Sequence, residues 1–296
     1  MPVLREFRFW CGVLLIAVRL GRKARSVRSS AGRICRTVTL AALLSLGVPA
    51  CSTASDPGAL LSHDALSPGT RDMTILVVGD SWARSFGVGM NSVGKSQNNT
   101  IVNAAQGGCG IMLSAEEEVG KKRTPTPTQC NAWPTEWPKL IDQHKPQAVL
   151  LSTSFWDQAA QVIDDSGKLK TIDAPDFQKA YAVHLDQALE LLGRGGARVF
   201  LTTTTDGDPG PYRTKSDAMN KAVRAAVARN AAKGTSLLSV RDQLCDDSGC
   251  PREIHGIQVY DDTGHPTKEA QDRLGAWMLD AMHEAVGQHQ GSEPSA

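Results

Sequence analysis

The sequence predicts an α/β fold, a three-layer α/β/α arrangement with a mainly parallel five-stranded sheet. Two observations support this class. From residue 73 onward, short apolar runs of strand length alternate with longer segments that are compatible with helices. The chain also has 296 residues, of which 41% are hydrophobic, and this is enough to bury one sizeable core. We find no internal repeat and no second folded domain in the sequence.

The first half of the folded region supplies three strands. Residues 73–78 form an apolar, β-branched run, and residues 82–95 are compatible with a helix. "TIVN" at 100–103 predicts the second strand, and residues 134–144 predict a helix. "QAVLLST" at 147–153 predicts the third strand.

The second half continues the alternation. Residues 176–192 predict an amphipathic helix, which "GRGG" ends. "ARVFLTT" at 197–203 predicts the fourth strand, residues 216–233 a helix of small and basic residues, and residues 235–240 the fifth strand. Residues 266–286 predict the closing helix. The apolar stripe of the helix at 176–192 consists of Phe177, Ala180, Tyr181, His184, Leu185, Ala188, Leu191 and Leu192.

Two stretches between these elements have the character of long loops. They are Gly107–Cys130 and Gln158–Pro175. Folds of this class place their sites at the carboxyl ends of the strands, and long loops there often frame a site. We therefore expect these two stretches to border the functional site.

The N-terminal part of the chain has the pattern of an export signal. Residues 1–51 hold nine Lys and Arg and one acidic residue, whereas the remainder holds 23 Lys and Arg and 30 Asp and Glu, a net charge of −7. Basic residues precede the apolar run Thr37–Cys51, and "VPAC" resembles a bacterial lipobox with Cys51 as the acylated residue. An uncleaved anchor or a plain secretory signal are the alternatives. The acidic remainder argues against a nucleic-acid partner.

These features predict four segments and an exported protein that is either tethered to the cell membrane or secreted. The segments are an export signal or anchor at 1–51, a flexible tether at 52–72, a folded domain at 73–288 and a disordered tail at 289–296. We expect membrane contact through the N-terminal segment only.

Cysteine usage in the folded region agrees with export. The four cysteines there are Cys109, Cys130, Cys245 and Cys250, an even number that suggests two disulfides. Proximity in the sequence pairs Cys109 with Cys130 and Cys245 with Cys250, although three pairings are possible and the sequence does not choose between them. A zinc site is the alternative, but it is disfavoured because no Cys-x-x-Cys occurs.

Ser81 stands at the junction between the first strand and the first helix, after Gly79 and Asp80. Three interpretations compete for "GDS". Asp80 and Ser81 are both good N-caps. A phosphate loop is suggested by "GMNSVGKS" at 89–96, but this match starts ten residues after the strand ends and "QNNTIV" follows it, so we treat the match as chance. The third interpretation makes Ser81 a nucleophile.

The far end of the chain favours the nucleophile. "VYDDTGHPTKEA" places Asp262 three residues before His265, just ahead of the last helix. A serine hydroxyl needs an imidazole to accept its proton and a carboxylate to orient the imidazole. One short turn can supply both groups, and Asp261 is an alternative to Asp262 as the orienting residue.

Together the two motifs resemble the SGNH/GDSL hydrolase family, and more narrowly the SGNH domains associated with bacterial membrane acyltransferases. "GGCGI", "LCDDSGCP" and "LSTSFWD" contribute to the narrower resemblance. The resemblance implies a flavodoxin-like sheet, a Ser81-His265-Asp262 triad, and an oxyanion hole made by the N–H groups of Ser81 and Gly108. Trp156 stands where the family usually has the Asn of Gly-x-Asn-Asp, and its indole can serve as a third donor.

The implied function is an esterase or acyl-transfer domain that acts on O-acyl groups, with acetyl expected, of envelope glycans or glycolipids. No metal or organic cofactor is expected, and a separate membrane acyltransferase is an expected partner. The rival hypothesis is a catalytically weak glycan-binding accessory module, in which Trp133, Trp137 and Trp156 would be stacking platforms.

Overall fold

A computed structural model of the chain describes residues 72–206 and 213–290. The expected signal, the tether up to residue 71, Cys51 and the end of the expected tail lie outside these residues. The described residues all belong to one compact unit.

A five-stranded parallel sheet forms the centre of the unit, as predicted. Its order is β2-β1-β5-β7-β8, with every neighbouring pair parallel. Counted along the chain this is the order 2-1-3-4-5 of flavodoxin-like sheets. The strands are β1 (Thr74–Gly79), β2 (Thr100–Asn103), β5 (Ala148–Ser152), β7 (Arg198–Thr202) and β8 (Thr235–Leu238).

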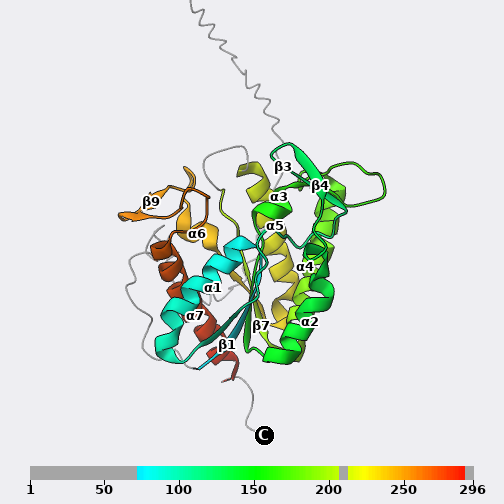
Figure 1. Ribbon diagram of the computed structural model, residues 1–296. Helices are drawn as coiled ribbons and strands as arrows, with labels where there is room; N and C mark the ends of the chain where they lie inside the picture. Colours follow the sequence, from blue (N-terminus) through cyan, green and yellow to red (C-terminus); the bar gives the residue numbers. More distant parts are fainter. Residues whose placement is uncertain (1–71, 207–212, 291–296) are drawn as a thin grey trace, which may run out of the picture. The chain divides into compact units, whose positions relative to one another are not determined.

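Helices cover both faces of the sheet (Figure 1). Alternate residues of β1 explain the two layers, because Ile75 and Val77 pack in the core cluster that contains α1 and α7 residues, whereas Leu76 and Val78 pack in the cluster that contains α2, α4 and α5 residues. The helices are α1 (Ser81–Gly94), α2 (Trp133–His144), α3 (Phe155–Gln158), α4 (Pro175–Leu192), α5 (Arg213–Asn230), α6 (Val240–Leu244) and α7 (Lys268–Gln290). Every helix and strand predicted for the central layers is therefore present, with small shifts at the ends.

The two stretches expected to be long loops were predicted wrongly in part, because they form a small antiparallel sheet. Its order is β4-β3-β6, with β3 at Glu116–Val119, β4 at Lys122–Pro125 and β6 at Ala160–Val162. The charged residues of β3 and β4 hide the strand signal, because Glu and Lys are uncommon in strands. The turn at Gly120–Lys121 has positive φ at both residues, which is the geometry of a tight hairpin turn. A second short hairpin joins β9 (Glu253–Ile254) to β10 (Ile257–Gln258).

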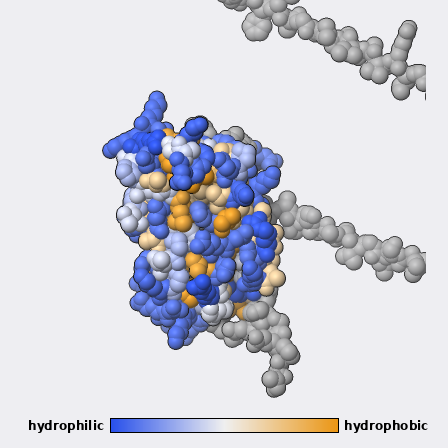
Figure 2. Space-filling view, turned by 90° about the vertical axis from the view of Figure 1, so that its right-hand side faces the viewer, coloured by the Kyte–Doolittle hydropathy of each residue, from blue (hydrophilic) through white to orange (hydrophobic). Residues whose placement is uncertain are grey.

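The side of the domain on which α2 and α4 lie is largely hydrophilic, with apolar residues scattered among polar ones (Figure 2). Among the residues described, the large exposed apolar side chains are Val88, Phe155 and Val183, on three different helices. None of the helices described combines the length and the hydropathy needed to cross a bilayer.

The contact between α1 and α7 is unusually close and fixes how these helices cross. A Cβ atom on Gly89 would lie 1.8 Å from the carbonyl oxygen of Gln271, and a Cβ atom on Gly275 would lie 2.4 Å from the carbonyl carbon of Gly89. The two glycines thus let the helix backbones touch. Gly89 and Gly94, two glycines of the phosphate-loop match, lie inside α1, where their Cβ positions face α7 residues. The match is therefore a packing feature and not a strand-to-helix phosphate loop.

Both expected disulfides are present. Cys109 is bonded to Cys130, and Cys245 to Cys250. The alternative of a zinc site on these cysteines is excluded, because all four sulfurs are paired. More generally, the described residues contain no group of three or more His, Cys, Asp and Glu that could hold a metal ion.

Candidate active site

The site begins with the sharp turn at the carboxyl end of β1. Gly79 has a φ of +123°, and a Cβ atom there would lie 1.9 Å from the carbonyl oxygen of Ser152 on the neighbouring strand β5. Only glycine fits this close approach. The chain can therefore turn at once from β1 into α1, with Asp80 and Ser81 at the sheet edge.

Asp80, and not Ser81, caps the helix. One carboxylate oxygen of Asp80 accepts hydrogen bonds from the backbone N–H groups of Trp82 at 2.9 Å and Ala83 at 3.4 Å. The Arg84 N–H bonds to the Asp80 carbonyl at 3.0 Å. Since the first four N–H groups of a helix have no partner within it, the N–H of Ser81 is the one left without a partner among the described residues. This N–H is available to a ligand.

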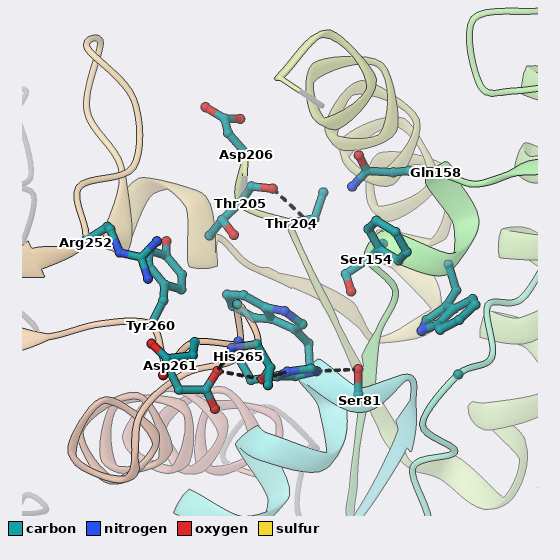
Figure 3. A pocket seen from close by; sticks show the side chains of 17 residues that line it. Ser81, Ser154, Gln158, Thr204, Thr205, Asp206, Arg252, Tyr260, Asp261 and His265 are labelled. Atoms are coloured by element: carbon teal, nitrogen blue, oxygen red, sulfur yellow. Dashed lines mark hydrogen bonds between the residues drawn. The ribbon is translucent and has the colours of Figure 1, made fainter. Parts of the chain in front are cut away.

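The Ser81 side chain is bonded to His265. His265 lies in the loop before α7, and its Nε2 is 2.7 Å from Ser81 Oγ (Figure 3). The two residues are 184 positions apart in the chain. The structure thus brings together the two ends of the domain, as the predicted pairing requires.

Asp262 is not the neighbour of the imidazole. The structure places the Thr263 hydroxyl 2.8 Å from His265 Nδ1, and no hydrogen bond joins Asp262 to His265. Asp262 is exposed at the rim of the same cavity. Asp261, the alternative, contacts Thr263 and the backbone of His265 but not its ring. Thr263 is a site residue that the sequence analysis missed.

Gly108 stands in a loop that the Asp157 carboxylate holds. The Asp157 carboxylate accepts hydrogen bonds from the N–H groups of Ile111 and Met112, each at 2.9 Å. Burial raises the pKa of Asp157 to about 7, with a smaller contribution from the nearby Asp80, although the two amide bonds act to lower it. Gly108 and Ser81 line the same cavity.

Trp156 lies beside Gly108. A Cβ atom on Gly108 would be 3.9 Å from the Trp156 ring. None of the described residues accepts a hydrogen bond from the Trp156 indole. The ring packs edge-on against Phe155, whose side chain is partly exposed. Trp133 and Trp137 differ from Trp156, because they are buried in the core, so they are not stacking platforms.

Burial also raises the pKa of Asp80. Its second oxygen accepts a hydrogen bond from Ser154 Oγ, a further residue of the cavity wall. A fully buried carboxyl with these partners is a structural cap, since it presents no free oxygen to the cavity. Ser154 therefore supports the turn that carries Ser81.

The cavity that these residues share has a volume of about 520 Å³. Ser81 and His265 lie on one side of it, and Thr205 and Asp206, which follow β7, lie across from them (Figure 3). The Asp206 carboxylate forms an ion pair with Arg241 at 2.9 Å. The remaining lining residues are Trp82, Phe155, Gln158, Thr204, Arg252, Tyr260 and Gly264.

Comparison with known proteins gives the family of the chain. A sequence model of the family described as "SGNH domain (fused to AT3 domains)" matches residues 50–280. The fold, a parallel sheet with a serine at the end of its first strand, and the match over most of the chain define the class: the protein belongs to the SGNH/GDSL family, in the group that occurs fused to AT3 acyltransferase domains. No curated protein sequence matches the chain.

Solved structures with a similar fold are remote in sequence. A GDSL-like lipase from Bacteroides thetaiotaomicron is 13% identical, with a TM-score of 0.48 over 72% of this chain and 89% of that one. The periplasmic domain of a lipopolysaccharide acetyltransferase from Salmonella ser. Paratyphi A is 16% identical, with a TM-score of 0.43 over 69% and 81%. A carbohydrate esterase of family 3 from Talaromyces cellulolyticus is 11% identical, with a TM-score of 0.44 over 73% and 99%.

Proposed function

We propose that the protein is an esterase or acyl-transfer enzyme that acts on O-acyl groups, acetyl above all, of cell-envelope glycans or glycolipids. The observation that carries the proposal is the 2.7 Å hydrogen bond between Ser81 Oγ and His265 Nε2, at the floor of an open cavity. This is the contact through which an imidazole activates a serine. Membership of a family that acts on esters supports it.

The proposed reaction has two acyl transfers. His265 Nε2 takes the proton of Ser81 as Oγ attacks the ester carbonyl. The N–H groups of Ser81 and Gly108, with the Trp156 indole as a third donor, hold the oxyanion. His265 then gives the proton to the departing sugar oxygen, which leaves an acyl-serine. In the second transfer His265 takes a proton from water or from an acceptor hydroxyl as its oxygen attacks the acyl carbonyl. The bond from the carbonyl carbon to Ser81 Oγ then breaks, and His265 returns the proton to Ser81 Oγ.

The size and polarity of the cavity support a glycan as the part of the substrate that leaves. A volume of about 520 Å³ lies in the range of sites for ligands the size of drugs or sugars, and an acetyl group alone needs far less. The wall opposite Ser81 carries the hydroxyl groups of Thr204 and Thr205 and the charged groups of Asp206 and Arg252. Such groups can bond to sugar hydroxyls, whereas Phe155 and Trp156 offer aromatic surface to a sugar ring.

We also propose that the domain works outside the cytoplasm, held at the membrane by its N-terminal segment with Cys51 as the candidate lipid attachment site. Two disulfides in the described part support an oxidising compartment. The family's fusion to AT3 domains supports a membrane acyltransferase as the partner, which would supply or receive the acyl group.

Labelling with a serine-reactive fluorophosphonate tests the proposal. The full-length protein should be labelled at Ser81, and Ser81→Ala should lose both the label and p-nitrophenyl acetate turnover. Ser92→Ala is the matched control, because Ser92 is an exposed serine of the same helix that does not line the cavity. If the wild type is not labelled but binds acetylated glycans, the accessory-module hypothesis replaces the enzyme.

A further inference from the structure

To act as a general base, His265 must be held in one of its two neutral tautomers. In that tautomer Nδ1 carries the hydrogen and Nε2 offers its lone pair to the serine hydroxyl. Asp262, which the sequence suggested for this role, is not bonded to the ring. The group at Nδ1 is the Thr263 hydroxyl, at 2.8 Å.

The same hydroxyl also contacts a carboxylate. Thr263 Oγ1 lies 2.6 Å from Asp261 Oδ1. That oxygen accepts two further hydrogen bonds, from the backbone N–H groups of Thr263 at 2.8 Å and His265 at 3.1 Å. The Asp261 carboxylate therefore closes the turn, and three donors bond to its Oδ1 atom.

Counting donors fixes the direction of each bond. A threonine hydroxyl has one hydrogen, and an ionised carboxylate can only accept. The Thr263 hydrogen bond lowers the pKa of Asp261, so this carboxyl is ionised at neutral pH. The single hydrogen of Thr263 is thus donated to Asp261, since otherwise two acceptor oxygens would face each other at 2.6 Å. The Thr263 oxygen is then left as an acceptor, and its neighbour Nδ1 must supply the hydrogen.

We propose that Thr263 is a positioning residue that links Asp261 to His265, so that an Asp261–Thr263–His265–Ser81 chain takes the place of a direct carboxylate–imidazole contact. The proposal rests on the proposed function for its catalytic meaning, but its structural claim concerns the tautomer alone. With Nδ1–H donated to Thr263, Nε2 is the acceptor for the Ser81 hydroxyl 2.7 Å away. In Figure 3 the residues of this chain that are labelled, Asp261, His265 and Ser81, follow one another along one side of the cavity.

The backbone of the loop supports this arrangement. The Asp261 N–H donates to the carbonyl of His265 at 2.8 Å, and the Gly264 N–H donates to the carbonyl of Asp261 at 3.1 Å. These bonds tie both ends of the five-residue turn together. Thr263 is therefore held between the two side chains that it joins, and little conformational entropy remains to be lost when the chain of hydrogen bonds forms.

The test compares three variants of the full-length protein. Thr263→Val removes the hydroxyl and keeps the side-chain shape, Thr263→Ser keeps the hydroxyl, and Asp262→Asn removes the charge that the sequence motif suggested. Two readouts are taken: kcat/KM for p-nitrophenyl acetate, and the imidazole nitrogen shifts of 15N-histidine-labelled protein, with the His265 signals assigned by their loss in His265→Gln. The shifts report the tautomer whether or not the protein turns over substrate.

We expect the wild type and Thr263→Ser to hold the Nδ1–H tautomer. Thr263→Val should lose that fixed tautomer and fall about 10- to 100-fold in kcat/KM, the loss typical of a hydrogen bond to a group that becomes charged. Asp262→Asn should keep the Nδ1–H tautomer of the wild type, because Thr263 and not Asp262 contacts Nδ1. The proposal is overturned if Thr263→Val keeps the wild-type tautomer, or if Asp262→Asn gives the result expected for Thr263→Val. If Ser81→Ala turns over the ester as fast as the wild type, the proposed function fails, and the tautomer shifts still decide on Thr263.

Discussion

The close crossing of α1 and α7 positions Ser81 and His265, and Gly89→Ala tests this directly. Ser81 is the first residue of α1, and His265 precedes α7 by three residues. A methyl group on Gly89 would lie 1.8 Å from the Gln271 carbonyl oxygen, whereas ordinary contact begins at 3.4 Å. The backbone of α7 would have to move by about 1.6 Å relative to α1 to accept it. A shift of this size is large compared with the tolerance of a 2.7 Å hydrogen bond.

Two effects of known size should follow from this shift. A displacement of about 1 Å between reacting groups can lower the rate about 100-fold, so we expect kcat/KM of Gly89→Ala for p-nitrophenyl acetate to fall by about that factor. Overpacking of a core costs about 1–3 kcal/mol. For a domain of this size that corresponds to a fall in Tm of about 2–12 °C. Circular dichroism and thermal melts measure the second effect and show whether the variant is folded at the assay temperature.

Gly94→Ala is the matched control. It places the same methyl group in the same helix, but its nearest contact is the flexible end of the Leu279 side chain at 3.1 Å. This contact can give way, so activity should stay within about threefold of the wild type. Gly275→Ala, whose Cβ would meet the backbone of α1, should resemble Gly89→Ala. If Gly89→Ala keeps wild-type Tm and kcat/KM, the crossing does not set the Ser81–His265 distance and the reasoning is refuted.

Two further predictions concern the loop that carries Gly108. Asp157 binds its proton more tightly in the folded protein, with a pKa of about 7, than at its ordinary value of 3.8, so the stability that it contributes is present below pH 4 and is lost as the pH rises to 7. The free energy of unfolding, measured from pH 4 to 8, should therefore fall for the wild type relative to Asp157→Asn across that interval, by an amount on the order of a few kcal/mol; parallel curves would contradict the assignment. Replacing both Cys109 and Cys130 by alanine should lower the free energy of unfolding by about 3 kcal/mol. It should also lower kcat, because Gly108 is the neighbour of Cys109 in the chain. The disulfide between Cys245 and Cys250 closes a shorter loop, so its removal should cost about 2 kcal/mol. Equal kcat values for the wild type and the variant that lacks the bond at Cys109 would show that this disulfide does not position Gly108 for the reaction.

The central sheet could be predicted because its signals are local and strong. Each strand is a short apolar run between turn residues, and the helix at Pro175–Leu192 shows its buried stripe in the sequence. The disulfide pairs are the two that proximity in the sequence favoured. The contact between Ser81 and His265 could be predicted because their motifs stand at element boundaries, where this fold class places its sites.

The small sheet and the environment of His265 could not be predicted in this way. Strand β3 reads "EEEV" and depends for its pairing on β4 and β6, which are partners that no local pattern indicates. The Asp-x-x-His spacing shows which residues share the turn. Which side chain reaches Nδ1 of His265 depends on the φ and ψ angles within the turn. A hydroxyl two residues before the histidine was the one signal for Thr263, and a turn residue is its commoner meaning.

The hydrogen bonds of the first N–H groups of α1 explain why Ser81 follows an aspartate. Four N–H groups at the start of α1 need hydrogen-bond acceptors. Asp80 accepts from three of them, two through its carboxylate and one through its carbonyl. Had Ser81 been the cap, its hydroxyl would accept a hydrogen bond from the helix and would be turned away from His265. Because Asp80 is buried and also bonded to Ser154, the capping does not depend on the occupant of the cavity. In the proposed mechanism the Ser81 hydroxyl, which is bonded to His265, attacks the ligand, and the Ser81 N–H donates to the charge that the attack creates. Ser154→Ala should therefore weaken the turn without removing a reacting group, so its kcat/KM should fall less than about tenfold, far less than in Ser81→Ala.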